Sequence, residues 1–342
     1  NFFQFYTDRG SVPYGFMPPY LQESEANGMN SAAAVLFNIS KNKKEATFFT
    51  KMGLGEYARI ETGHASNFFH LTWKALAAPN VGPIAATTHH ETFRWYYELL
   101  RDWRGKFRHH EAPNSVEPDK PIDATGARLL FYSLPLKKLY ITGKDGYVAN
   151  SIDSKEAKAI VETGSHRGRY HELSEETLLS RLGSWNAATR YRAAEELPKR
   201  EGDWLKICLE RLKKGSQNEK YGALSLLGRL KEASVPALPV LVQGLGDSDL
   251  WYRVLSARAL GSMGSSASPA IKPMLEAVHQ NFLGDERKLF HSTLIDNLFT
   301  QRRGKGLLSD QAAFDKVDRP LLIRTLKVLL MNEDGVVTKL SQ

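Results

Sequence analysis

The stretch Asn27-Gly28-Met29-Asn30-Ser31-Ala32 decides how the first half of the chain folds. It places a glycine beside small polar residues and directly before an apolar run. This pattern is typical of a helix start, because polar side chains cap the first turn and glycine permits an unusual backbone turn into it. The pattern recurs at Thr62-Gly63-His64-Ala65-Ser66-Asn67 and at Ala124-Thr125-Gly126-Ala127. We expect the three glycines to be equivalent entrances to helices that run side by side.

The helices that follow these glycines are apolar over most of their length, which predicts an inner layer buried on two sides. More amphipathic segments alternate with them and predict an outer layer. An inner helix followed by an outer helix, three times over, predicts αα-hairpins of an α/α toroid. A closed ring needs about twice as many helices. We therefore expect a partial toroid whose remainder lies upstream of Asn1, and the alternative is an open superhelix that runs straight into the repeats. The inner segments are residues 32–39, 68–78 and 129–140, and the outer segments are residues 43–52, 91–103 and 154–163.

A second pattern begins near residue 174, where short amphipathic helices recur at a near-constant spacing. Three matching tyrosines, Tyr191, Tyr221 and Tyr252, lie 30 and 31 residues apart. Two prolines that begin predicted helices, Pro239 and Pro273, lie 34 residues apart. Stacked helical pairs show such periods, and the pattern resembles HEAT-type repeats. The sequence therefore predicts an all-α chain, with a toroid-like αα-hairpin domain over residues 1–173 and a HEAT-like α-solenoid over residues 174–342.

The amino-acid composition excludes several classes of protein. The chain has 342 residues, of which 42% are hydrophobic and 25% charged, which suits two packed domains. Its single cysteine, Cys208, excludes internal disulfides and multi-cysteine metal sites. We predict no metal site and no cofactor. No apolar run approaches the roughly 20 residues of a membrane-spanning helix. The opening segment has no basic or apolar signal region, so export from a bacterial cell would need a signal peptide upstream of this sequence.

The charge balance favours acidic partners. Lys and Arg number 46 against 38 Asp and Glu, a net charge of +8. Residues 181–232 carry 12 basic and 7 acidic side chains, so we expect a protein or an acidic polymer along one edge of the solenoid. An anionic saccharide is a further candidate, nucleic acid is disfavoured, and a solvated face is the commoner explanation of such a charge run. The candidate edge residues are Arg190, Arg192, Lys199, Arg200, Lys213, Lys214 and Lys220.

Polar residues around the three glycines predict a ligand site. If the inner helices lie side by side, these residues gather at one mouth of the toroid, where helix N-termini attract an anionic ligand. His64 is the candidate general acid or base, because imidazole exchanges a proton near neutral pH. The structural alternative for His64 is a helix cap or a hydrogen-bonded core histidine. The candidate ligand-binding residues are Glu25, Asn27, Asn30, Asp123 and Thr125.

The run Phe93-Arg94-Trp95-Tyr96-Tyr97 supplies candidate substrate contacts. Arg94 and Tyr96, with Asn67, have the residue types that a polysaccharide-cleaving enzyme uses to neutralise and position an acidic sugar. However, consecutive residues point all around a helix. We therefore interpret most of the aromatic run as core between the hairpins.

Four motifs carry a family resemblance: Glu61–Phe69, Gly82-Pro83, Trp95–Leu99 and Trp103–Phe107. Over about residues 10–170 the chain resembles an uncharacterised bacterial family, in which a domain similar to the terpenoid cyclase and protein prenyltransferase α/α toroid precedes helical repeats. The resemblance implies this architecture and brings no established reaction. The chain lacks the Asp-x-Asp-Asp acid of the cyclases, and its cysteine lies outside the toroid half, which leaves cyclase and prenyltransferase chemistry unsupported.

Two classes of function stay open. The first is a binding or scaffolding protein with a toroid-type ligand mouth. The second is a lyase or hydrolase acting on an anionic or sulfated polysaccharide, with His64 as the acid or base and with catalytic-site contacts from Asn67, Tyr96 and Arg94. Convergence of His64, Asn30, Asn67 and Asp123 in one open pocket would favour the enzyme.

Overall fold

A computed structural model describes residues 2–13, 18–22, 28–56, 68–109, 122–133, 150–165, 169–280, 285, 288–300 and 306–330. The protein is all-α, as the sequence predicts. Over the described residues, its named strands are limited to one antiparallel pair, β1 (Arg108–His109) and β2 (Ile122–Asp123). The chain divides into two compact units. The first comprises Asn1–Glu172 and Asn186–Thr189, and the second comprises Leu173–Trp185 and Arg190–Gln342.

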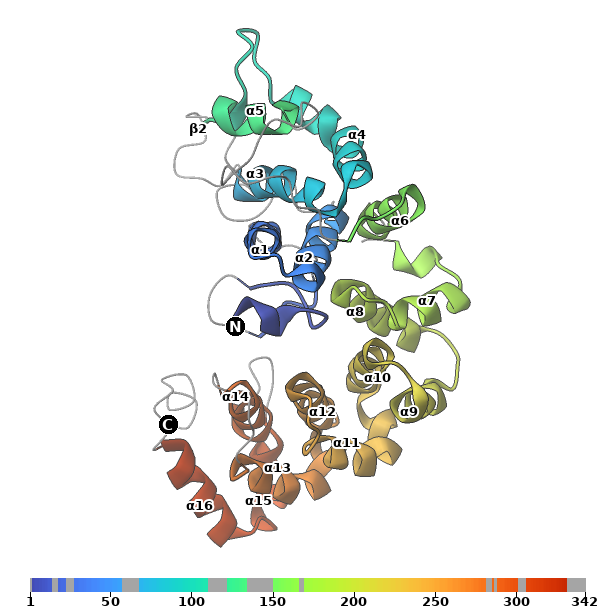
Figure 1. Ribbon diagram of the computed structural model, residues 1–342. Coiled ribbons are helices and arrows are strands. Elements are labelled where there is room, and N and C mark those ends of the chain that lie inside the picture. The colour runs from blue at the N-terminus through green and yellow to red at the C-terminus, as the bar shows by residue number, and fades with distance from the viewer. Residues whose placement is uncertain are drawn as a thin grey trace. The chain divides into compact units, whose positions relative to one another are not determined.

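The first unit has a helix in each of the segments predicted to be helical. These helices are α1 (Met29–Ile39), α2 (Lys43–Gly55), α3 (Phe68–Ala77), α4 (Pro83–Leu99), α5 (Thr125–Ser133) and α6 (Ser154–Ser165). Helix α1 packs against α2 and α3, α3 packs against α5, and α6 packs against α2 and α4 (Figure 1). Helix α4 begins earlier than predicted, because Pro83 occupies the first turn, where a helix needs no backbone N–H donor.

Gly28 and Gly126 are not equivalent. Gly28 precedes α1 in the left-handed region, with φ of 75°, and a Cβ there would lie 2.7 Å from the carbonyl oxygen of Phe69 on α3. Glycine is therefore required where α1 starts against α3. Gly126 lies inside the first turn of α5, and a Cβ there would meet no atom within 4 Å. Gly63 lies outside the described residues.

The second unit is a succession of short helices. They are α7 (Glu175–Leu182), α8 (Ala187–Glu196), α9 (Trp204–Lys214), α10 (Gln217–Leu230), α11 (Leu238–Gly244), α12 (Leu250–Ser262), α13 (Ile271–Val278), α14 (Leu289–Ile295), α15 (Gln311–Asp315) and α16 (Arg319–Leu330). Helix α10 packs against α9 and α12, α12 packs against α11 and α14, and α13 packs against α14 and α16. The three landmark tyrosines fall on α8, α10 and α12.

Two arginines make the same contacts in different parts of this unit. The guanidinium of Arg190 on α8 donates to the carbonyls of Ser184 and Trp185, and lies 5.6 Å from the ring of Tyr221 on α10. Arg253 on α12 donates to the carbonyls of Asp247 and Ser248, and lies 5.5 Å from the ring of Phe290 on α14. Each arginine thus ties a helix to the loop before it and to a neighbouring helix.

Candidate functional site

Several predicted site residues lie outside the part of the chain that the structure describes. They include the candidate general acid or base, His64, and part of the predicted ligand mouth, so the convergence of the site residues stays a prediction. These residues are Glu25, Asn27, His64 and Asn67.

Asn30 is a buried structural residue at the start of α1. Its Oδ1 accepts a hydrogen bond from the backbone N–H of Val12 at 2.8 Å, and its Nδ2 donates to the hydroxyl of Ser11 at 2.9 Å. The side chain has no exposed surface. Asn30 therefore holds the N-terminal segment against α1.

Arg94 and Tyr96 point in different directions from α4. The Arg94 side chain is 64% exposed, and its Nε lies 3.7 Å from a Glu98 carboxylate oxygen. Tyr96 belongs to a buried cluster with Phe93, Tyr97 and residues of α3 and α5. Of the four aromatic side chains in this run, Trp95 is exposed and the other three are buried. The interpretation that most of this run is core is confirmed.

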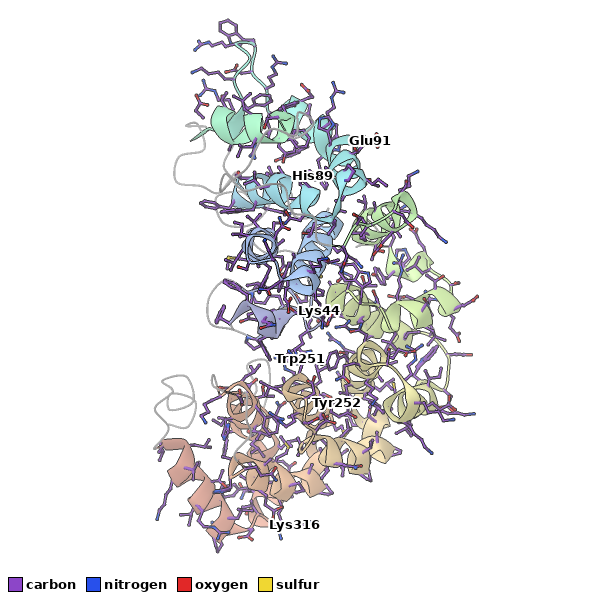
Figure 2. All side chains as sticks on the ribbon, in the orientation of Figure 1. Lys44, His89, Glu91, Trp251, Tyr252 and Lys316 are labelled. Atoms are coloured by element: carbon purple, nitrogen blue, oxygen red, sulfur yellow. The ribbon has the colours of Figure 1, made fainter. Side chains whose placement is uncertain are left out.

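The inner side of α4 also buries a histidine. Figure 2 shows His89 and Glu91 on opposite sides of this helix, and His89 has no exposed surface. Its ring lies 5.0 Å from the ring of Phe93 and 5.5 Å from that of Phe131 on α5. Burial, followed by the positive charges of Lys74, His70 and His90, lowers the pKa of His89 well below its usual value. His89 is therefore neutral at pH 7.

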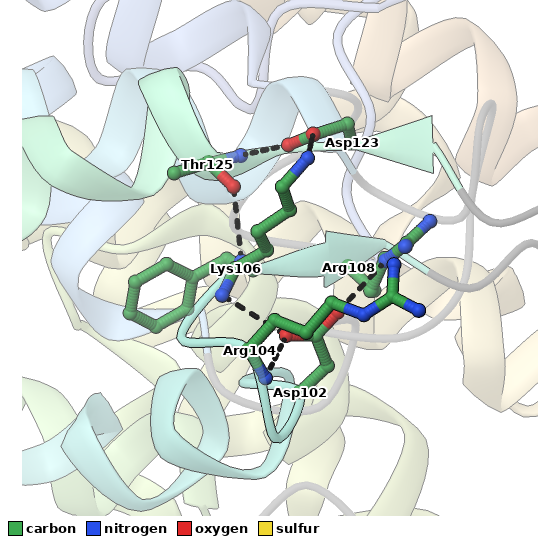
Figure 3. Close-up of polar contacts among 7 residues, drawn as sticks. Asp102, Arg104, Lys106, Arg108, Asp123 and Thr125 are labelled. Atoms are coloured by element: carbon green, nitrogen blue, oxygen red, sulfur yellow. Dashed lines mark hydrogen bonds and ion pairs between the residues drawn. The ribbon is translucent and has the colours of Figure 1, made fainter.

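Asp123 and Thr125 lie together beside a turn that connects α4 to β1. Asp123 Oδ1 accepts a hydrogen bond from the Thr125 backbone N–H at 3.0 Å, and its Oδ2 lies 3.4 Å from Lys106 Nζ. The Thr125 hydroxyl accepts a hydrogen bond from the backbone N–H of Phe107 at 3.0 Å. Figure 3 shows these contacts joining the start of α5 to the residues before β1.

Residues 100–109 form a hairpin, which we call the basic hairpin. Arg101 pairs with Phe107 as an isolated antiparallel bridge, and the backbone N–H of Arg108 donates to the carbonyl of Leu100 at 2.8 Å. Gly105 turns the chain with φ of 81°, in the left-handed region that glycine tolerates. In Figure 1 this hairpin extends beyond α5.

Asp102 fixes the turn of the basic hairpin. Its Oδ1 accepts hydrogen bonds from the backbone N–H groups of Arg104 and Lys106 at 2.9 and 3.0 Å, and its Oδ2 accepts one from Arg108 Nε at 3.3 Å (Figure 3). Desolvation opposes ionisation, but these hydrogen bonds outweigh it and lower the pKa of Asp102. The hydroxyl and N–H of Thr125 lower the pKa of Asp123 to about 2. Both carboxylates are therefore ionised at pH 7.

The rest of the turn is open to solvent. Trp103 is 87% exposed, and the Arg104 guanidinium lies 4.7 Å from its ring. The Lys106 side chain is 52% exposed. At the base of the hairpin, the buried Phe107 ring lies 5.3 Å from that of Tyr132, whose hydroxyl donates to Glu98 at 3.0 Å. The hairpin thus presents an aromatic ring and cations on a backbone anchored to α4 and α5.

The sequence analysis placed residues 100–103 at the end of an outer helical segment, but α4 ends at Leu99, and it used Trp103–Phe107 only as a resemblance motif. A signal was present, because an Asp three residues before a Gly is typical of a hydrogen-bonded turn. Four basic residues around a tryptophan then mark it as a candidate binding surface.

The predicted solenoid edge is partly wrong. Arg190 and Arg192 are buried, at 3% and 9% exposed, so neither lines a surface. Arg200 donates to the carbonyl of Leu173 at 2.7 Å. Of the seven candidates, the ones that the structure leaves exposed are Lys199, Lys213 and Lys214.

Across the described ranges, no group of three or more His, Cys, Asp and Glu side chains is arranged to hold a metal ion. No helix of that part of the chain is long and apolar enough to cross a membrane.

Comparison with known proteins gives one family. The model of a family described as "Domain of unknown function (DUF6288)" matches residues 1–143, which include the basic hairpin. The expectation of an uncharacterised family agrees with this match. No curated protein and no solved structure matches the chain.

Proposed function

We propose that this protein is a helical binding and scaffolding protein that holds an acidic macromolecular partner at its basic hairpin. In this proposal the first unit is part of an α/α toroid and the second unit is a HEAT-like solenoid. The alternation of helices in the first unit and the repeated arginine contacts in the second support that architecture.

The distribution of charge carries the proposal. Residues 1–172 contain 21 basic and 18 acidic side chains. The basic hairpin alone contains four basic side chains and one acidic side chain, which equals the whole excess. The basic and acidic side chains of residues 1–172 outside the hairpin therefore balance, and the hairpin is a short segment with a net positive charge. Such a segment attracts acidic partners over about 8 Å at physiological ionic strength.

The chemistry of the hairpin favours binding over acid–base catalysis. A general acid or base works best when its pKa lies near the working pH. The pKa of Asp123 is about 2, and that of Asp102 is also lowered. Their oxygens accept hydrogen bonds that hold the backbone. The carboxylates thus order the turn, while Arg101, Arg104 and Lys106 stay exposed on its surface.

Binding to fluorescein-labelled poly-L-glutamate tests the proposal. We expect the triple variant Arg101→Ala, Arg104→Ala, Lys106→Ala to bind about threefold to a hundredfold more weakly, since each exposed ion pair contributes about 0.2–1 kcal/mol. The wild-type affinity should also fall steeply as salt rises. The matched control removes three exposed lysines of the solenoid in the variant Lys199→Ala, Lys213→Ala, Lys214→Ala.

A larger loss of affinity in the control would place the binding surface on the solenoid and contradict the proposal. Equal affinities of wild type and hairpin variant would also contradict it. Incubation with heparin provides a further check, because new reducing or unsaturated ends that depend on His64 would favour the polysaccharide-cleaving enzyme.

A further inference from the structure

Large apolar side chains are exposed on the last turns of α4 and in the turn of the hairpin that follows it. Trp95 is 47% exposed, Leu99 is 75% exposed and Trp103 is 87% exposed. Trp95 and Leu99 are four residues apart on α4 and therefore share one face of it. Trp103 follows in the turn of the hairpin. We call these three residues the apolar ridge. Large exposed apolar groups rimmed by charge are typical of interaction sites.

The ridge is attached to an ordered backbone. Asp102 accepts two backbone hydrogen bonds across the turn that carries Trp103. Leu99 ends α4 and is followed by the buried Leu100, which anchors that helix end in the core. Binding therefore has to order few backbone torsions, which lowers its entropic cost. Trp and Arg are also the residues that most often dominate the free energy of protein interfaces.

We infer that the apolar ridge and the basic hairpin together form a docking surface for an acidic segment of a partner protein, one that carries apolar side chains among its carboxylates. The inference rests on the proposed function and adds the class of partner. Carboxylates of the segment meet Arg101, Arg104 and Lys106. Its apolar side chains cover Leu99 and Trp103.

Other occupants fit this surface less well. A sulfated glycan offers anions and sugar faces, which suit Arg104 and Trp103 but gain little from an aliphatic side chain such as Leu99. A second copy of this chain carries the same net charge of +8 and the same basic hairpin. Like charges at an interface cost free energy, so self-association at this surface is disfavoured.

Three defined anionic probes test the inference on the full chain: poly-L-glutamate, a random glutamate–tyrosine copolymer in a 4:1 ratio, and heparin. We expect the wild type to bind the copolymer about tenfold more tightly than poly-L-glutamate, because two or three buried apolar contacts of about 0.5–1 kcal/mol each add to the charge term. The double variant Leu99→Ser, Trp103→Ser should lose this preference and keep its affinity for poly-L-glutamate. The matched control is Ile323→Ser, Leu330→Ser, which removes two exposed apolar side chains of α16.

The outcomes separate the inference from the proposed function. If the wild type binds both polypeptides equally well, the inference is wrong and the proposed function stands. If no polypeptide probe binds, both are wrong. If heparin affinity depends on Leu99 and Trp103 while copolymer affinity does not, the surface serves a glycan and the inference is overturned. Loss of the copolymer preference in the α16 control would also overturn it.

Discussion

Asp102 accepts a hydrogen bond from the backbone N–H of Lys106 at 3.0 Å and so closes the turn on which Trp103 stands. The same carboxylate accepts from the N–H of Arg104 and from Arg108. One acidic side chain thus orders a segment in which most other charges are positive. Two different substitutions of Asp102 can therefore separate the effect of the hydrogen bonds that order the turn from the effect of its charge.

Two substitutions of Asp102 remove the same charge but differ in hydrogen bonding. Asp102→Asn keeps a side-chain oxygen that accepts from the turn, whereas Asp102→Ala removes it. We expect amide hydrogen exchange of Arg104 and Lys106 to accelerate in Asp102→Ala and to stay slow in Asp102→Asn. Poly-L-glutamate should bind more weakly to the alanine variant than to the asparagine variant. Identical exchange rates in the two variants would show that the side-chain acceptor does not order the turn.

Gly28 and Gly126 should respond oppositely to alanine. Gly28→Ala places a Cβ 2.7 Å from the Phe69 carbonyl oxygen at a φ of 75°, so we expect a loss of about 1–3 kcal/mol in the free energy of unfolding. Gly126→Ala occupies open space within a helical turn and should be neutral or stabilising by up to about 1 kcal/mol. Urea denaturation of the two variants measures both. A tolerated Gly28→Ala would contradict the close approach of α1 to α3.

Acid should destabilise the first unit through His89. Above about pH 6.5 the histidine is neutral in both the folded and the unfolded chain. As the pH falls further, the unfolded chain binds a proton that the buried ring cannot accept, so stability decreases by about 1.4 kcal/mol per pH unit until the lowered pKa of the folded state is reached. We expect His89→Leu to flatten the dependence of the free energy of unfolding between pH 6.5 and pH 5.

The matched control for His89 is His171→Gln, because the His171 side chain is 67% exposed. That variant should keep the wild-type dependence on pH. An unchanged slope in His89→Leu would mean that another group governs the acid response.

Arg253 should contribute more to stability than the neighbouring Arg258. Arg253 is 1% exposed and donates to the carbonyls of Asp247 and Ser248, so Arg253→Ala removes these hydrogen bonds and empties a buried site. We expect a loss of about 2–4 kcal/mol in the free energy of unfolding of the second unit. Arg258 lies 5.2 Å from the ring of Trp251, and Arg258→Ala should cost less than about 1 kcal/mol. Thermal denaturation followed by circular dichroism compares the two variants, and equal losses would contradict the tethering role of Arg253.

Helical periodicity predicted the positions of the helices better than it predicted how the helices pack against one another. The apolar segment predicted at residues 68–78 is α3, and the amphipathic segment at 154–163 is α6, because each pattern is local. Helix α4 starts at Pro83, where the sequence has no clear period to mark it. The nonequivalence of Gly28 and Gly126 depends on the approach of α3 to one of them only, which no local pattern reports.

The candidate site was predicted in part. Asp123 and Thr125 were selected for their place before a helix, and they do lie in a polar cluster. Their partner Lys106 comes to them through the pairing of β1 with β2, a contact between segments separated in sequence. Asn30 was selected for the same reason as Asp123. Its side-chain amide, however, is hydrogen-bonded to the backbone N–H of Val12 and to the hydroxyl of Ser11. The position of a polar residue beside a helix start therefore does not show whether its side chain binds a ligand or forms hydrogen bonds within the protein.

The intrinsic fluorescence of Trp103 can report binding at the basic hairpin. The chain has six tryptophans, and this one stands almost fully in water beside a guanidinium. Its emission should be red-shifted in the free protein, and covering the indole should shift it to the blue. Binding of a partner to the turn can then be measured from the shift in tryptophan emission, without a fluorescent label.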